Sequence, residues 1–118
     1  KTAELVFLQV IEPLAASVVS TLSPQTVKEL EAVRQEEAKN YLERVAAPFG
    51  ASGFRVQTMV RHGKVVEAIL ENAVKIKADL IVMASHGRSG LAKFALGSVT
   101  ERVIRYADIP VLVVRVTA

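Results

Sequence analysis

Four short apolar runs recur along the chain, with longer polar or amphipathic stretches between them. The runs cover residues 4–11, 54–60, 79–84 and 109–116. Three of them are nearly continuous in Val, Ile and Leu, which is typical of strands covered on both faces. The run at 54–60 begins by alternating apolar and polar side chains, so we predict a strand nearer the edge of a sheet there.

The longest amphipathic stretch begins at Ser23-Pro24, where a serine suits the N-cap of a helix and a proline suits its first turn. Apolar residues then recur at helical spacing, and we expect this helix to end before Pro48. The preceding segment, residues 15–22, shows neither strand alternation nor loop chemistry. It is left open as a mobile or partly helical connection.

Two further helices are predicted, one within residues 62–78 and one within 98–107. Ser98 and Glu101 have the spacing of a capping box, so Ser98 is expected to cap the second of these. Strands that alternate with helices imply right-handed crossovers and a parallel sheet covered on both sides. The predicted fold class is therefore α/β.

In parallel α/β sheets, ligands bind beyond the carboxyl ends of the strands. The stretch ASHGRSGLAKFALGSVTERV, residues 84–103, follows such a strand end and holds no carboxylate before Glu101. Gly87 and Gly90 allow close approach of the main chain to a ligand, and a helix start offers unpaired N–H groups. These features suit a phosphate chain. The alternative is that the glycines only form a turn and Ser98 only caps its helix.

Composition narrows the possible functions. The 118 residues are the size of one domain, and the absence of cysteine excludes disulfides and thiolate metal sites. The net charge of +3 comes from scattered Lys and Arg, so nucleic acid is not an expected partner. No apolar run is long enough to span a membrane, and we expect a cytoplasmic protein. His62 and His86 are the two histidines, too few for a metal site.

Residues 79–115 closely resemble the carboxyl half of a universal stress protein domain, and AELVFLQVIEP at 3–13 resembles that family's second strand. The family's nucleotide-binding members carry G-x-x-G-x9-G-[ST], and here Gly87, nine residues, Gly97 and Ser98 fall in register. The resemblance implies a three-layer α/β/α domain of the Rossmann-like, adenine nucleotide alpha hydrolase-like type. It also implies a stress-response regulator that binds ATP, with AMP or ADP as alternatives and Mg²⁺ able to accompany the nucleotide.

Carried over residue by residue, the resemblance places Val10 and Met83 on the two sides of the base, and Ala84 and Gly87 at the turn beside the ribose and phosphates. The phosphates would lie at the helix start, on Gly97, Ser98, Val99 and Thr100. Two neighbouring basic residues are His86 and Arg88. No nucleophile with a base is visible, so no catalytic residue is assigned, and at most slow ATP hydrolysis is expected.

Two departures from the family pattern matter. Ala84 stands where the pattern has its first glycine, and the family's first strand and helix have no counterpart. In the family strand order 3-2-1-4-5 the missing strand is central, so the single domain at 1–118 is expected to lack its amino end. The last strand lies at the sheet edge in that order, and we expect a homodimer through Val111 to Val116.

Two other functions stay open beside ATP binding. One is a dimeric interaction module of the same family that binds no nucleotide, which Ala84 would favour. The other is an enzyme on the same fold class, such as a hydrolase or a redox flavoprotein.

Overall fold

The computed structural model describes residues 3–85 and 96–115. The chain divides into two compact units, residues 1–64 and 65–118. Each unit contains one pair of parallel strands together with helices from the same part of the chain. Among the described residues, no helix combines the length and hydropathy that crossing a bilayer requires.

The first unit is built on strands β1, Glu4–Ile11, and β2, Arg55–His62. They pair in parallel over their whole length, from Glu4 opposite Arg55 to Ile11 opposite His62. Both strands were predicted from their apolar runs, and the early alternation of β2 is confirmed, with half-buried Val56 between exposed Arg55 and Gln57. Parallel strands need a long crossover, and helices α1 and α2 supply it.

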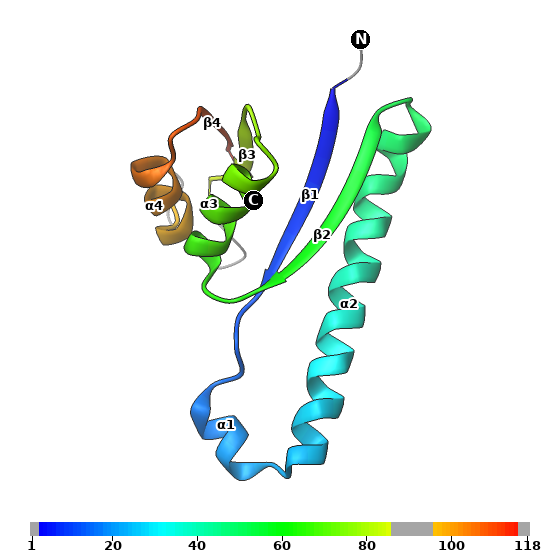
Figure 1. Ribbon diagram of the computed structural model, residues 1–118, viewed down its shortest axis with the longest axis vertical. Helices are drawn as coiled ribbons and strands as arrows, with labels where there is room; N and C mark the ends of the chain where they lie inside the picture. Colours follow the sequence, from blue (N-terminus) through cyan, green and yellow to red (C-terminus); the bar gives the residue numbers. More distant parts are fainter. Residues whose placement is uncertain (1–2, 86–95, 116–118) are drawn as a thin grey trace. The chain divides into compact units, whose positions relative to one another are not determined.

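Helix α1, Ala16–Thr21, occupies the segment left open in the sequence, and it has no buried residue. Helix α2, Pro24–Ala51, starts as predicted, because the Ser23 hydroxyl accepts a hydrogen bond from the Thr26 N–H at 3.1 Å. Figure 1 shows α2 lying along β2 and continuing past the ends of the strands toward α1. The buried residues of α2 recur every four positions, at Ala38, Leu42 and Ala46.

The predicted end of this helix before Pro48 is wrong, because α2 continues through the proline to Ala51. Pro48 lies in the last turn, where its missing N–H breaks a single ladder bond. Its carbonyl accepts a hydrogen bond from the Ser52 N–H at 3.1 Å. The Phe49 ring lies 5.3 Å from that of Phe7 and 6.3 Å from that of Phe54, so aromatic packing holds the turn in place.

The second unit contains, in chain order, α3 (Val65–Lys75), β3 (Ile81–Ala84), α4 (Ser98–Tyr106) and β4 (Val111–Val114). Strands β3 and β4 pair in parallel, with Ile81 opposite Val111 and Ala84 opposite Val114. The pairings β1–β2 and β3–β4 are those that the family strand order gives to these four strands. All four strands and the three predicted helices are thus present.

Helices α3 and α4 pack against each other, and α4 also packs on β4. Val66 and Val103 are the buried apolar residues of these helices, and Val103 has no exposed surface. Three polar residues, Asn72, Ser85 and Thr100, are buried in the same unit. Buried polar groups in proteins are nearly always hydrogen-bonded. Two of these three residues, Ser85 and Thr100, lie where β3 ends and α4 begins.

Candidate functional site

Two hydrogen bonds join the end of β3 to the start of α4, and two consecutive carbonyl groups of the strand end accept them. The Ala84 carbonyl accepts from the Thr100 hydroxyl at 2.8 Å, and the Ser85 carbonyl accepts from the Gly97 N–H at 2.8 Å. The Ser85 N–H in turn donates to the Val114 carbonyl of β4 at 2.8 Å. One strand end, one helix start and the neighbouring strand are therefore fixed to each other at this point.

Within residues 3–85 and 96–115, no side chain caps the first turn of α4. Gly97 is the N-cap residue, with extended backbone at φ −67° and ψ 157°, and Ser98 is already the first helical residue. The predicted capping box is therefore wrong, because a capping box requires Ser98 to be the N-cap residue, and that residue is Gly97. Glu101 instead lies 3.9 Å from Arg105 one turn further on, in a pair whose side chains are 61% exposed.

An uncapped helix start has a definite chemical capacity. The first N–H groups of an α-helix have no acceptor within the helix, and the helix dipole places partial positive charge on them. In α4 these are the N–H groups of Ser98, Val99 and Thr100. Ser98 is exposed and adds a hydroxyl, so this turn offers donors to an anion from both main chain and side chain.

The structure brings together six of the residues singled out from the sequence. They are Met83, Ala84, Gly97, Ser98, Val99 and Thr100, all at the junction of β3 with α4. Val10 lies on β1, in the first unit. Three others, His86, Gly87 and Arg88, lie outside the described residues.

Ser85 is a residue of this junction that the sequence analysis missed. It is 6% exposed, and its main chain bonds to both Gly97 and Val114. A small polar residue directly after an apolar strand was the available signal. The sequence analysis also did not predict that the Thr100 hydroxyl donates its single proton to a protein carbonyl.

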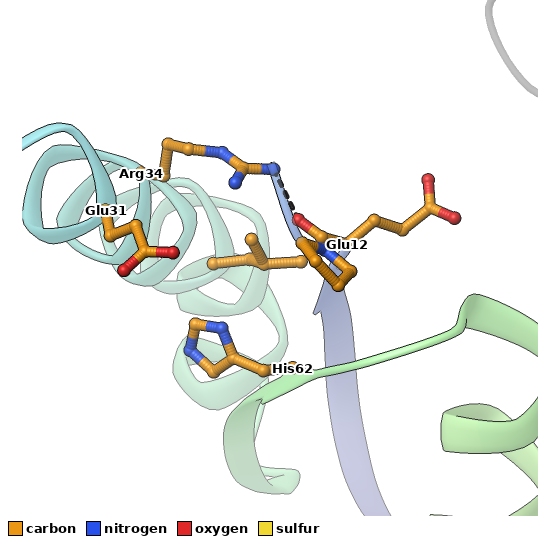
Figure 2. Close-up of a pocket in the computed structure, with 6 residues that line it drawn as sticks. Glu12, Glu31, Arg34 and His62 are labelled. Atoms are coloured by element: carbon orange, nitrogen blue, oxygen red, sulfur yellow. Dashed lines mark hydrogen bonds between the residues drawn. The ribbon is translucent and has the colours of Figure 1, made fainter. Parts of the chain in front are cut away.

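A second polar cluster lies in the first unit, at the carboxyl ends of β1 and β2. The Arg34 guanidinium donates to the Glu12 carbonyl at 2.8 Å, and His62 Nε2 forms a 2.6 Å hydrogen bond with Gln35 Oε1. Beside them is a cavity of about 160 Å³ that Glu31 also lines. In Figure 2, the His62 ring points toward α2 and the Glu12 carboxylate points away from Arg34. These bonds attach both strand ends to α2.

That cluster does not form a metal site. Within residues 3–85 and 96–115, no group of three or more His, Asp or Glu side chains is placed to hold a metal ion. One of its carboxylates turns outward, and a single imidazole remains with Glu31. We therefore assign the cluster to the attachment of α2 to the strands.

The parallel strands with their crossover helices, and the junction at the carboxyl end of β3, define an α/β protein of the Rossmann-like class. The model of the Universal stress protein family matches residues 1–115. The chain belongs to the universal stress protein family.

Individual relatives agree with this assignment. The chain is 43% identical to universal stress protein MJ0531 of Methanocaldococcus jannaschii over 81 residues, which is 69% of this chain and 48% of that protein. It is 41% identical to MJ0577 of the same organism over 80 residues, 68% of this chain and 49% of that one. The aligned part thus spans about half the length of these curated relatives.

Two solved structures share the fold. The MJ0577 structure superposes with a TM-score of 0.85 at 35% identity, covering 100% of this chain and 79% of that one. Universal stress protein UspA from Lactobacillus plantarum gives a TM-score of 0.79 at 24% identity, covering 96% of this chain and 78% of that chain. The predicted α/β fold class is confirmed.

Proposed function

We propose that this universal stress protein binds an adenine nucleotide, with ATP the first candidate, and that the start of α4 holds its phosphates. The observation that carries the proposal is the first turn of α4, which the Ser85 and Ala84 carbonyls hold against the end of β3 and which no side chain of the described residues caps. Family membership and the register of Gly97 and Ser98 support it. The role of the whole protein as a stress-response regulator is part of the same proposal.

In this proposal, the N–H groups of Ser98, Val99 and Thr100 donate to phosphate oxygens, and the Ser98 hydroxyl adds a further donor. Gly97 leaves room for the phosphate because it carries no Cβ. Met83 and Val10 are proposed to contact the base, and Mg²⁺ would be coordinated by the phosphate oxygens. Slow hydrolysis at most, and a cytoplasmic location, remain predictions from the sequence.

Replacement of Gly97 tests the proposal. Its backbone at φ −67° and ψ 157° is extended, a conformation that Ala and Val adopt without backbone strain. We expect the full-length protein to give calorimetric heat with ATP, the Gly97→Ala variant to bind more weakly, and the Gly97→Val variant not to bind. Far-ultraviolet circular dichroism should be the same for all three. Absence of heat with ATP, ADP and AMP at millimolar concentration would show that the proposal is wrong.

We further propose a homodimer through the outer edge of β4. Pro110 and Val114 direct their carbonyls to Ile81 and Ser85 on the β3 side. Because peptide groups alternate along a strand, the N–H and carbonyl of Val113 point to the opposite edge, where a second copy could pair. Leu112 and Val114 are each 53% exposed and would add apolar surface to the contact.

An interaction module that binds no nucleotide is the second candidate, and Ala84 is the observation that favours it. Ala84 stands where the family pattern has a glycine, and its carbonyl is bonded to the Thr100 hydroxyl. If its methyl group closes the site, the unmodified protein gives no heat with nucleotides while the Ala84→Gly variant does. Equal ATP binding by both proteins would exclude this candidate.

A further inference from the structure

The Thr100 side chain makes a bond that is unusual for a threonine in a helix. Helical Ser and Thr hydroxyls commonly bond back to the carbonyl of a preceding turn of the same helix. The Thr100 hydroxyl instead donates to the Ala84 carbonyl, sixteen residues earlier, at 2.8 Å. Thr100 is 3% exposed, so the donor side of this bond is shielded from water.

This bond acts together with a second one on the same turn of α4. The Gly97 N–H donates to the Ser85 carbonyl, so positions 97 and 100 are tied to two consecutive carbonyls at the end of β3. A single hydrogen bond would allow the helix start to rotate about that contact. Two hydrogen bonds at neighbouring positions fix the direction in which the N–H groups of residues 98–100 point.

We propose that the Thr100 hydroxyl is a positioning group that sets the orientation of the phosphate-binding turn and does not itself donate to phosphate. The inference rests on the proposed nucleotide function and assigns this residue its part in it. A hydroxyl has one proton to donate, and that proton is used on Ala84. The contribution of Thr100 to a bound phosphate is therefore its main-chain N–H.

Two substitutions separate the hydroxyl from the shape of the side chain. Thr100→Val keeps the branched shape and removes the donor, which leaves the Ala84 carbonyl without its partner. Thr100→Ser removes a methyl group and keeps the donor. If the hydroxyl positions the turn, the serine variant retains function and the valine variant does not.

The test compares ATP with adenosine, which lacks phosphates. Titrations of the full-length wild-type, Thr100→Val and Thr100→Ser proteins would use calorimetry for ATP and ligand-observed NMR for adenosine. We expect Thr100→Val to weaken ATP binding about tenfold, the order of magnitude that follows from the loss of one hydrogen bond that orients the turn. Adenosine affinity should stay unchanged in that variant, and Thr100→Ser should bind ATP within about twofold of wild type.

Each alternative outcome contradicts a different statement. Loss of ATP and adenosine affinity in parallel would mean that Thr100 only maintains the fold, and unchanged ATP affinity in Thr100→Val would mean that the bond does not position the turn. Either result overturns this inference but does not contradict nucleotide binding by the wild-type protein. A wild-type protein that binds neither ligand would overturn the proposed function and this inference with it.

Discussion

Val103 offers a quantitative test of how α4 is held in place. Its side chain is 0% exposed on the buried face of α4, one turn beyond Thr100. Val103→Ala removes about two methylene equivalents, worth about 1.6 kcal/mol in transfer from water, and the resulting cavity adds to the loss. Alanine recovers up to about 0.7 kcal/mol through its higher helix propensity. The free energy of unfolding should therefore fall by about 2 kcal/mol.

Val74 supplies the matched control, because it is a valine in the neighbouring helix α3 and is 71% exposed. Val74→Ala removes the same atoms where little is buried, so its free energy of unfolding should stay within about 0.5 kcal/mol of wild type. Urea denaturation of the full-length proteins measures both, provided that the m-value is unchanged. Equal losses in the two variants would refute the assignment of Val103 to the core.

Two further predictions concern the strand edge and the backbone. Val113→Pro removes an outward N–H of β4 and should convert the proposed dimer into a folded monomer in light scattering, whereas Leu112→Pro breaks the β3 ladder and should unfold the unit. A dimer that survives Val113→Pro would exclude this edge. Gly63→Ala, at φ +135°, should lower the free energy of unfolding by more than about 1 kcal/mol, whereas Gly50→Ala in α2 should raise it by about 0.5 kcal/mol. Equal changes at the two glycines would argue against the assigned backbone of Gly63.

Local sequence signals predicted the positions of the strands and most helix boundaries. The start of α2 followed from Ser23-Pro24, because the cap and the proline act within one turn. The end of α2 did not follow from Pro48, because the next residue, Phe49, packs against Phe7, which is far away in the sequence. Tertiary packing decided that boundary.

The buried face of α3 shows the same limit. Val74 is one of the apolar residues from which the helix within residues 62–78 was predicted, yet it is exposed, while Asn72 is 5% exposed. At 100° per residue, Val74 lies about 80° from Val66 to one side and Asn72 about 120° to the other. Periodicity identifies an apolar stripe, but the elements packed against a helix decide which part of it is covered.

The sequence indicated the junction of β3 with α4 as a candidate site but not the hydrogen bonds within this junction. The rule for parallel sheets and the glycines led to the junction of β3 with α4. The capping box failed because a motif fixes spacing and not the residue at which the helix begins, which is Ser98. The bond from Thr100 to Ala84 spans sixteen residues, and no local pattern encodes such a contact.

The hydrogen bonds of Ser85 also bear on which changes of sequence this junction tolerates. The Ser85 N–H donates to the Val114 carbonyl, and the Ser85 carbonyl accepts from the Gly97 N–H, so both bonds use main-chain atoms. Every residue type except proline supplies the same donor and acceptor. The bond from Thr100 to Ala84, in contrast, requires a side chain with a hydroxyl group. Evolution or design can therefore change the side chains at positions 85 and 97 without removing these main-chain bonds, whereas position 100 is restricted to serine or threonine if its bond is to be kept.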